Sequence, residues 1–279
     1  MTWVIRLLAL MLATLPAKGL GDSQYTVMTF NIRYGTANDG DNSWPNRDHL
    51  VMQVIHDRDA QIVGVQEALA FQLDEITAQF PHYAVIGVGR DDAKTAGEYS
   101  AILYRADRFI VDSSGTFWLS DTPETVASTT WGNSITRICT WARLIERSSG
   151  DAIYVFNTHY DHRSQESREK SSQLIRDRIA NRAHDDPVVL MGDFNAGESN
   201  PAITSINNSD LIHAYRALHP DEALVGTFNA FTGKSDGEMI DHIFVSSGVK
   251  ILDADIDRTN DNGRYPSDHY PVWSTVELP

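Results

Sequence analysis

Five apolar, β-branched segments of this chain each carry an acid, an amide or a histidine at one end or just beyond it. The segments, with the residues that they deliver, are VMTFNI (Asn31), VGVQEA (Glu67), MGDFNAG (Asp193 and Asn195), MIDHIFVS (Asp241) and YPSDHYPV (Asp268 and His269). A short apolar run of this kind is typical of a buried β-strand. If the five ends converge at one rim, their carboxylates, amides and imidazole form a hard-cation site with acid–base groups beside it.

Strand and helix patterns alternate along the chain. The predicted strands are Tyr25–Ile32, Ile62–Gln66, Tyr83–Val88, Tyr99–Tyr104, Ile138–Ile145, Ala152–Thr158, Val188–Gly192, Met239–Val245 and His269–Val276, and the predicted helices are Arg47–Arg58, Ala70–Gln79 and Gln165–Arg182. Some strands, such as Val188–Met191, are apolar on both faces, whereas others, such as Ile153–Phe156, alternate. This mixture predicts an α/β fold with two sheets packed face to face and helices outside.

The composition indicates a single domain. The chain has 279 residues, 42% of them hydrophobic, and shows no internal repeat and no linker-like shift from Tyr25 onward. We therefore predict one domain over residues 20–279. Long polar loops in such a domain are usually functional, so we expect three of them to wall a site. These loops, with their aromatic residues, are Gly35–Asn46 (Trp44), Ser120–Thr136 (Trp131) and Gly226–Glu238 (Phe228 and Phe231).

Residues 1–19 have the features of a cleaved secretory signal. Arg6 gives a positive start, Leu7–Leu15 is a short apolar stretch, and Ala17-Lys18-Gly19 offers small residues for cleavage. The alternatives are a first core helix or a membrane anchor, but the apolar run is shorter than the ~20 residues that span a bilayer. We therefore expect a secreted or periplasmic monomer without stable membrane insertion.

The net charge of the chain and its single cysteine limit the ligands and cross-links that it can have. Loss of Arg6 and Lys18 with the signal takes the formal charge from −15 to −17, and a chain this acidic has no general attraction for nucleic acid. A local basic site or bound cations can reverse this at the site itself, so nucleic acid remains an alternative partner. Cys139 is the only cysteine, which excludes an internal disulfide and thiolate metal sites.

Several candidate residues have a second interpretation when each is taken alone. Glu67 is either a metal ligand or an acid that caps the helix Ala70–Gln79, and Asn31 is either a neutral ligand or a turn residue that ends a strand. Asp193 and Asn195 lie two apart on a segment predicted to be extended, which would place both side chains on one face, beside an attacking water. The alternative is an Asx-turn that closes the strand.

Two histidines lie at predicted strand ends. A lone histidine there is more often structural, but His159 in NTHYDH and His269 in PSDH form a pair with acids available to orient both. Asp268 must point away from His269 if the segment is extended, so we assign Asp268 to the cation. Asp241 is then the candidate partner that raises the basicity of the His269 imidazole without reacting itself.

Eight fragments in a fixed order resemble the endonuclease/exonuclease/phosphatase family, the metal-dependent superfamily of deoxyribonuclease I. They are TFNIRYG, VGVQEA, GEYSAILYR, TRICTWARL, NTHYDH, VVLMGDFNAG, MIDHIFV and YPSDHYPV, and they cover essentially the whole chain after the signal. The resemblance implies a four-layer α/β sandwich of two packed mixed β-sheets flanked by helices, with one or two Mg²⁺ ions or Mn²⁺ as a substitute. The strings GTANDGDNSWPNRDHL and FWLSDTPE look most like secreted bacterial members of the deadenylase/nocturnin-like branch.

The resemblance also implies roles for individual residues. The metal-side residues are Asn31, Glu67 and Asp268. The residues implied in catalysis are Asp193, which positions or deprotonates the attacking water, Asn195, which contacts the phosphate, the Asp241–His269 pair, His159, and Glu98, which orients His159. Arg137 resembles a strand arginine that binds the scissile phosphate, and its alternative is a salt bridge to a surface acid.

These residues predict a hydrolase in which water attacks phosphorus directly and no covalent enzyme intermediate forms. We expect a secreted, Mg²⁺-dependent phosphoesterase that favours phosphomonoesters of a small sugar or nucleotide. One alternative is a phosphodiesterase or nuclease that acts on nucleic acid or a lipid head group. Another, of a different class, is a catalytically inactive binding module on the same fold, which the intact candidate residues argue against.

Overall fold

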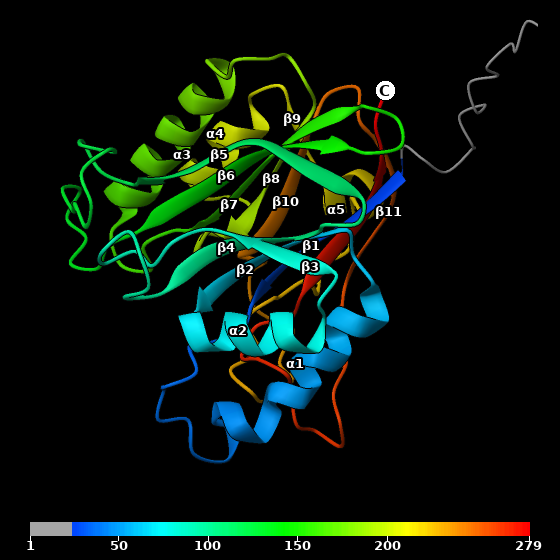
Figure 1. The fold of residues 1–279 in the computed structure, drawn as a ribbon. Helices are drawn as coiled ribbons and strands as arrows, with labels where there is room; N and C mark the ends of the chain where they lie inside the picture. Colours follow the sequence, from blue (N-terminus) through cyan, green and yellow to red (C-terminus); the bar gives the residue numbers. More distant parts are fainter. Residues whose placement is uncertain (1–23) are drawn as a thin grey trace, which may run out of the picture.

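Two six-stranded sheets pack face to face, and helices cover their outer faces (Figure 1). The computed structural model describes residues 24–279, so the predicted signal segment 1–19 lies outside the described residues. Helices α1 (Trp44–Arg58) and α2 (Ala70–Gln79) lie against the first sheet, and α3 (Gln165–Ala180) and α4 (Pro201–Asn207) lie against the second. This arrangement confirms the predicted four-layer α/β sandwich.

Each sheet is mixed, with one parallel pair near its centre. The first sheet has the order β11-β12-β1-β2-β4-β3 and the second has the order β5-β6-β7-β8-β10-β9. The strands are β1 (Gln24–Asn31), β2 (Ile62–Ala68), β3 (Tyr83–Ile86), β4 (Tyr99–Arg105), β5 (Phe109–Trp118), β6 (Ile138–Glu146), β7 (Ala152–His159), β8 (Val188–Asp193), β9 (Leu211–His213), β10 (Asp241–Ser246), β11 (Lys250–Ile256) and β12 (Val272–Glu277). The parallel pairs are β1–β2 and β7–β8, and the neighbouring strands are antiparallel to them.

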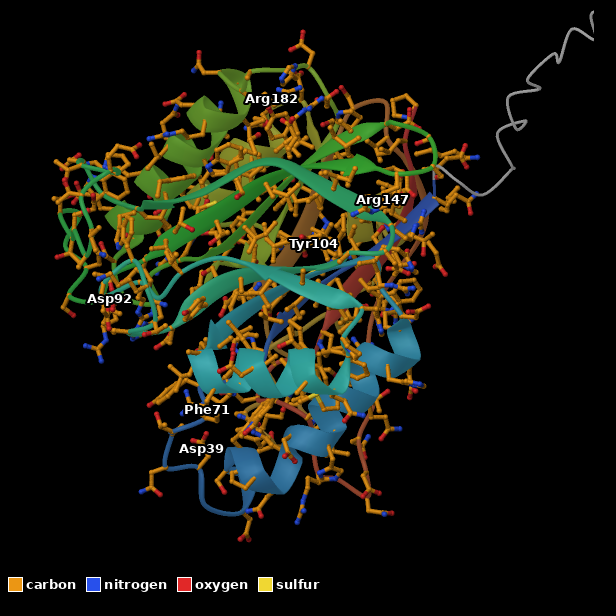
Figure 2. The ribbon with its side chains drawn as sticks, viewed as in Figure 1. Asp39, Phe71, Asp92, Tyr104, Arg147 and Arg182 are labelled. Atoms are coloured by element: carbon orange, nitrogen blue, oxygen red, sulfur yellow. The ribbon has the colours of Figure 1, made fainter. Side chains whose placement is uncertain are left out.

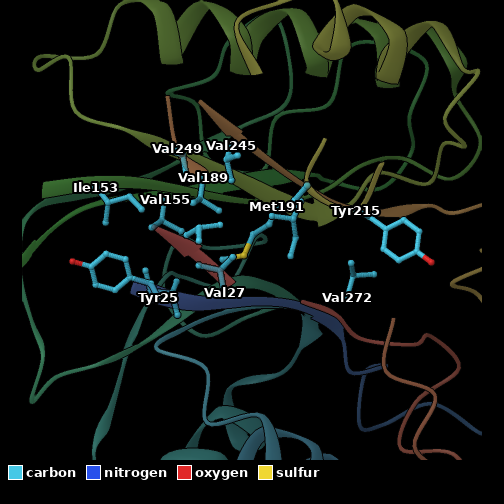
Figure 3. Packing of buried hydrophobic residues seen from close by; sticks show 14 of the residues in the cluster. Tyr25, Val27, Ile153, Val155, Val189, Met191, Tyr215, Val245, Val249 and Val272 are labelled. Carbon is cyan, nitrogen blue, oxygen red and sulfur yellow. The ribbon is translucent and has the colours of Figure 1, made fainter. Parts of the chain in front are cut away.

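The central core lies between the two sheets, where β-branched side chains from both interdigitate (Figure 3). Val27 of β1 packs in one cluster with Val155, Val189 and Met191 of the second sheet. The sheets approach so closely at Gly64 that a Cβ there would lie 2.8 Å from the Asn157 side chain and 2.9 Å from Met191 Cε. A larger residue here would have to displace the side chains of Asn157 and Met191.

The strands that sequence patterns did not predict are all at sheet edges: β5, β9 and β11. Their residues alternate between buried and exposed or are largely polar, as in the run Asp112-Ser113-Ser114, because one side of an edge strand faces solvent. The short helices α4 and α5 (Ala214–Leu218) and the 3-10 turn η1 (Gly40–Asn42) were also not predicted. Helix α1 begins at Trp44, three residues earlier than expected, because the following proline suits the first turn of a helix.

Charged side chains cover the outside of the molecule, as Asp92 and Arg147 illustrate (Figure 2). Across residues 24–279 no helix has the length and apolar character needed to cross a membrane. The central strands end together at one rim of the sandwich, and the predicted site residues lie at that rim.

Candidate active site

A cleft of about 480 Å³ opens at this rim. Eight of the ten predicted site residues line it: Glu67, Glu98, Arg137, His159, Asp193, Asn195, Asp268 and His269. The other two, Asn31 and Asp241, are fully buried, and each hydrogen-bonds to a residue of the lining. The structure therefore brings together all ten residues, which are spread over more than two hundred positions of the sequence.

Strand direction explains why these residues meet, and it corrects part of the sequence interpretation. The central parallel strands deliver Asn31, Glu67, His159 and Asp193 at or near their C-terminal ends. Strands β10 and β12 begin at Asp241 and Val272, not at Met239 and His269 as predicted. Because both run antiparallel to a central strand, it is their N-terminal ends that reach the rim. Asp241 accordingly pairs with Asp193 in register.

His269 is held by Asp241 and faces Asp193. Its Nδ1 lies 2.9 Å from Oδ2 of Asp241, and its Nε2 lies 3.8 Å from Oδ2 of Asp193. A carboxylate only accepts, so Nδ1 donates to Asp241. Burial favours the neutral ring, but the charges of Asp241 and Asp193 outweigh burial and raise the pKa of His269 well above its ordinary value. The Asp241–His269 pair that the sequence predicted is thus formed, with its imidazole held in the charged state.

Asp193 is the carboxylate on which the other groups converge. Its Oδ2 accepts a hydrogen bond from Asn31 Nδ2 at 3.0 Å and lies 3.4 Å from His159 Nε2. Its Oδ1 accepts from the backbone N–H of Asn195 at 2.9 Å. Burial, followed by repulsion from Asp241, raises the pKa of Asp193 to about 7. A carboxyl group with a pKa near neutrality is suited to accept and release a proton.

The segment from Asp193 to Asn195 is not extended, which corrects a second expectation. Asn195 has a φ of 47°, and its backbone N–H turns back onto Oδ1 of Asp193. This is the Asx-turn that the sequence left as an alternative. The Asn195 side chain donates to the carbonyl oxygen of Tyr160 at 3.1 Å, and both Asp193 and Asn195 still line the cleft. The turn and the proposed site are therefore compatible.

Glu67 lies at a bulge of β2, where its φ of 60° departs from strand geometry. A bulge re-aims a side chain, and strained backbone of this kind is concentrated at functional sites. The carboxylate accepts hydrogen bonds from Asn31 Nδ2 and from the backbone N–H of Tyr34, both at 3.2 Å. Glu67 does not cap helix α2, because the side chain of Gln72 accepts the N–H of Leu69 at that helix end.

Asp268 lies on the same side of the cleft as Glu67. The chain bends through Ser267 and Asp268, so Asp268 and His269 both line the cleft although they are adjacent in the sequence. The premise of an extended segment is therefore wrong, although the imidazole of His269 is held by Asp241 and not by Asp268. Burial is the main reason that the pKa of Asp268 is raised. Such a carboxylate gains most from a nearby cation.

The guanidinium group of Arg33 places a positive charge near Glu67 and Asp268. Its guanidinium lies 3.8 Å from both Glu67 and Asp268, beyond hydrogen-bond distance, while its hydrogen bonds go to Asp39 at 3.0 Å. Arg33 has a φ of 56°, and its carbonyl oxygen accepts from Arg47 and Gln72. The surrounding side chains therefore stabilise a strained conformation that carries a positive charge to the two acids.

The donors at this end of the cleft fit a hard divalent cation. Glu67 and Asp268 offer carboxylate oxygens, and Asn31 carries an amide oxygen that accepts from the backbone N–H of Arg33 at 3.0 Å. Such ligands suit Mg²⁺ or Mn²⁺ better than Zn²⁺. A second group places three ligand atoms within 4.8 Å of one another: Asp193, Asp241 and His269. There the Asp241–His269 hydrogen bond competes with metal binding. Chemically, the first group is the better cation site.

Glu98 binds an arginine instead of the histidine that it was expected to orient. Its two oxygens accept from Arg90 Nη1 and Nη2 at 2.7 Å each, whereas His159 Nδ1 lies 3.9 Å away. A bidentate pair of charged groups is stronger than a single bond to an imidazole, so Arg90 takes the carboxylate. Burial, and after it the charges of Arg137 and Arg90, lower the pKa of His159 well below its ordinary value. His159 is therefore neutral.

Arg137 precedes β6 and is only 4% exposed. Its Nη2 donates to Nδ1 of His162 at 3.1 Å, and its Nε lies 3.7 Å from Asp161. The acid that Arg137 approaches is thus the buried Asp161 and not an acid on the surface. An arginine only donates, which places the proton of a neutral His162 on Nε2.

Three further residues of the cleft that carry a guanidinium or imidazole group were missed by sequence reasoning: Arg33, Arg90 and His162. Arg33 follows Asn31 by two residues, just beyond the end of β1, so the end-of-strand rule could have found it. His162 belongs to the NTHYDH fragment and could have been found in the same way. Arg90 lies in the loop between β3 and β4, where no periodicity marks it.

Of the four aromatic residues in the loops expected to wall the site, Phe228 lines the cleft, and Trp44, Trp131 and Phe231 do not. The two tryptophans are 3% and 5% exposed and each donates its indole N–H to a neighbouring acid, so they pack their own segments. Phe228 is 47% exposed, and its ring centre lies 5.2 Å from that of His269. Of these four residues, Phe228 is the one that lines the cleft.

Arg47 of α1 ties together the segments on which the metal-side acids lie. Its fully buried guanidinium donates, over 2.7 to 3.1 Å, to the carbonyl oxygens of Asn42, Ile32, Pro266 and Arg33. Arg47→Met is expected to lower the free energy of unfolding by about 3 kcal/mol or more, because it removes four hydrogen bonds to backbone carbonyl oxygens. Urea unfolding measures this. Lys250→Met on β11, an exposed matched control, is expected to change it by less than about 0.5 kcal/mol. A similar small change in Arg47→Met would contradict the prediction.

Comparison with known proteins agrees with this geometry. The family model described as Endonuclease/Exonuclease/phosphatase family matches residues 28–269. The structure of an endonuclease/exonuclease/phosphatase from Bacteroides vulgatus is 36% identical, covers 92% of this chain and 99% of that one, and has a TM-score of 0.85. A mannosyl-6-phosphatase from Bacteroides thetaiotaomicron is 33% identical over 91% of this chain and 100% of that one, with a TM-score of 0.84. Nocturnin from Drosophila melanogaster is 26% identical over 282 residues, which are 85% of this chain and 42% of that protein.

The family model covers most of the chain and includes every residue of the cleft described above. The acids, amides and imidazoles meet at the rim where the central strands of both sheets end. The chain therefore belongs to the endonuclease/exonuclease/phosphatase family, whose members hydrolyse phosphate esters with the help of a divalent metal.

Proposed function

We propose that the protein is a secreted, Mg²⁺-dependent phosphomonoesterase that releases phosphate from a small phosphorylated sugar or nucleotide by direct attack of water. The position of Asp193 carries this proposal. Its Oδ2 is held by Asn31 and lies 3.4 Å from His159 Nε2 and 3.8 Å from His269 Nε2. A carboxyl group so placed, with a pKa of about 7, suits the transfer of a proton from an attacking water.

Each residue of the cleft has a separate role in the proposed reaction. Asp193 accepts the proton of the attacking water. His269, kept protonated by Asp241, donates to a phosphoryl oxygen on which negative charge increases in the transition state. Asn195 and Arg137 line the same cleft and offer further donors to the phosphoryl group. Fixed donors of this kind stabilise the transition state because they need no reorganisation.

The metal-side residues are Asn31, Glu67 and Asp268, which would hold the cation through oxygen atoms. When bound, Mg²⁺ supplies charge neutralisation on the phosphoryl and leaving oxygens. Arg33 keeps an additional positive charge 3.8 Å from the two carboxylates. The identity of the cation as Mg²⁺ rests on the hardness of these ligands.

Several features support a small monoester as substrate. A cleft of about 480 Å³ is of the size that holds a small molecule. The exposed ring of Phe228 offers a face to a sugar or a base beside His269. A chain with a formal charge of −15 has no general attraction for a polyanion. One of the similar structures is a mannosyl-6-phosphatase.

Turnover on a panel of phosphoesters tests the proposal. The panel contains mannose 6-phosphate, glucose 6-phosphate, AMP, plasmid DNA, single-stranded RNA and sphingomyelin vesicles, all at the same Mg²⁺ concentration. We expect a higher kcat/KM on a sugar phosphate or nucleotide than on DNA. Asp193→Asn, assayed beside the wild type, shows whether any release comes from a contaminating phosphatase. Efficient nicking of the plasmid, with every small ester inert, would instead support the phosphodiesterase alternative.

Export and a monomeric state are part of the same proposal. The support for export is the sequence of residues 1–19, with Arg6 before a short apolar run and small residues after it. N-terminal sequencing of exported protein checks this, and an intact Met1 on protein recovered from the cytoplasm would contradict it. Sedimentation equilibrium checks the monomer.

A further inference from the structure

Two histidines that take no part in the proposed reaction are buried next to each other behind the catalytic turn (residues 193–196). His242 on β10 is fully buried, and His213 at the end of the neighbouring strand β9 is 7% exposed. Adjacent side chains of a strand point to opposite faces, so His242 points away from the face of Asp241. Its ring packs against Phe194 of the catalytic turn, with the ring centres 5.5 Å apart. The pair therefore contacts the turn from the helix-covered face of the second sheet.

Hydrogen bonds through the two rings form a chain that ends on the catalytic turn. The backbone N–H of Arg216 donates to Nδ1 of His213 at 3.2 Å, and Nε2 of His213 lies 2.8 Å from Nδ1 of His242. Nε2 of His242 lies 2.9 Å from the carbonyl oxygen of Ala196. A carbonyl oxygen only accepts, so His242 donates from Nε2, and its Nδ1 accepts the proton on Nε2 of His213. All four ring nitrogens are paired when both rings are neutral, and burial lowers the pKa of both.

The catalytic turn has a conformation that needs support from its surroundings. Asn195 has a φ of 47°, in the left-handed region that residues other than glycine adopt infrequently. Its backbone N–H holds Oδ1 of Asp193 at 2.9 Å. His242 supports this turn on both sides of Asn195, through the ring contact to Phe194 and the hydrogen bond to Ala196. A movement of the turn would therefore rotate the carboxylate of Asp193.

The chain starts from a helix that is itself fixed. The side chain of Arg216 on α5 binds both carboxylate oxygens of Glu198, at 2.5 and 2.7 Å. Its Nη1 donates to the carbonyl oxygens of His219 and Glu222, at 2.9 and 2.7 Å. Glu198 lies two residues beyond Ala196, so α5 is joined to the segment of the catalytic turn by a charged pair as well as by the two imidazoles.

We propose that His213 and His242 are positioning residues, which hold the catalytic turn so that the carboxylate of Asp193 faces the attacking water. The inference rests on the proposed phosphoesterase function and extends its machinery to a second layer behind the cleft. The effect of both histidines passes through the backbone of Ala196, which His242 contacts. Displacement of a reacting group by about 1 Å lowers a rate by up to ~100-fold, so support of this kind is visible in turnover.

His242→Phe tests the inference, because it keeps a ring against Phe194 and removes the donor to Ala196. With 4-nitrophenyl phosphate at saturating Mg²⁺, we expect kcat to fall about tenfold or more and KM to change less than about threefold. His242→Gln offers an amide N–H in place of Nε2 and is expected to restore kcat to within about threefold of the wild type. An unchanged kcat in His242→Phe, or equal losses in the two variants, would overturn the inference.

Phe244→Leu is the matched control for loss of packing alone. The Phe244 ring lies 5.6 Å from that of Phe194, and its side chain has no hydrogen-bonding group. We expect this variant to lower the midpoint of thermal unfolding and to leave kcat within about threefold of the wild type, at a temperature where circular dichroism shows every variant folded. If Phe244→Leu lowers kcat as much as His242→Phe does, the histidine only stabilises the fold and the inference is overturned.

Hydrogen exchange of the Asn195 backbone N–H, followed by NMR, gives a readout that needs no turnover. We expect exchange about tenfold or more faster in His242→Phe than in the wild type or in Phe244→Leu, because the turn opens locally. Equal exchange in His242→Phe and the wild type would overturn the inference. A wild type that is inactive on every ester would contradict the proposed function, and the exchange would still decide whether the histidines hold the turn.

The ¹⁵N chemical shifts of the imidazoles test the chain in the wild type itself, and they decide the matter if His242→Phe does not fold. We expect both His213 and His242 to carry their proton on Nε2 and to have a bare Nδ1. A proton on Nδ1 of either ring would break the chain of hydrogen bonds to Ala196 and overturn the inference.

Discussion

Chelation with EDTA is expected to abolish phosphate release, and added Mg²⁺ is expected to restore it. The reason is that Glu67 and Asp268 bring two carboxylates to one end of the cleft, where burial raises the pKa of Asp268 and the Arg33 guanidinium lies 3.8 Å from both acids, beyond hydrogen-bond distance. Without a divalent cation, the two acids repel the negative charge of the substrate. Activity that persists unchanged in excess EDTA would rule out the proposed metal site.

The variant Glu67→Gln tests whether this one residue contributes to Mg²⁺ binding. It keeps the shape of the side chain and removes its charge, so we expect the Mg²⁺ concentration for half-maximal rate to rise about tenfold or more. Rate measured against Mg²⁺ tests this, with thermal unfolding to check that the fold is retained. Glu169→Gln on the exposed face of α3 is the matched control and should leave the Mg²⁺ dependence unchanged. An unaltered Mg²⁺ dependence in Glu67→Gln would place the cation elsewhere, and Asp193, Asp241 and His269 are the other candidate group.

His269→Ala and Asp241→Asn are each expected to lower kcat by about 10²-fold or more at saturating Mg²⁺. His269 Nδ1 donates to Asp241 over 2.9 Å, and the carboxylates of Asp241 and Asp193 keep the imidazole charged despite its burial. His269→Ala removes the donor to the phosphoryl group, and Asp241→Asn removes the charge that keeps it protonated. Both variants therefore lose the same function.

The double variant of Asp241 and His269 shows whether the two residues act together in catalysis or independently of each other. We expect it to be little slower than either single variant, because an orienting acid and its imidazole act together and their losses do not add. Single-turnover rates of all four proteins measure the coupling directly. Fully multiplicative losses would show that Asp241 and His269 act separately, in conflict with their hydrogen bond.

The central strands of the sandwich could be predicted from the sequence because they are apolar over their full length. Val188–Met191 and Val63–Val65 are buried on both faces, and such runs are recognisable without any knowledge of their neighbours. The edge strands β5, β9 and β11 could not be recognised in this way. Their polar residues face solvent, and only the hydrogen bonds to an adjacent strand make them strands.

The site residues could be predicted in their identities but not in all of their contacts. Asp241 was assigned to His269 from the sequence, and the structure has that hydrogen bond. Glu98 was assigned to His159, but Arg90 binds its two oxygens because a guanidinium offers two charged donors. No local pattern marks Arg90, which lies in a loop, so the competition between the two partners was invisible in the sequence.

The sequence by itself determined which chemical groups are available and that they lie at the ends of buried strands, because apolar runs and the polar residues that interrupt them are local features. The tertiary structure alone decided which end of each strand reaches the cleft. Strands β10 and β12 run antiparallel to their central neighbours, so Asp241 and His269 enter from the start of a strand, whereas Asn31 and Asp193 enter from the end of one. Strand direction is set by hydrogen bonds between residues far apart in the chain, and those bonds form only when the two sheets assemble.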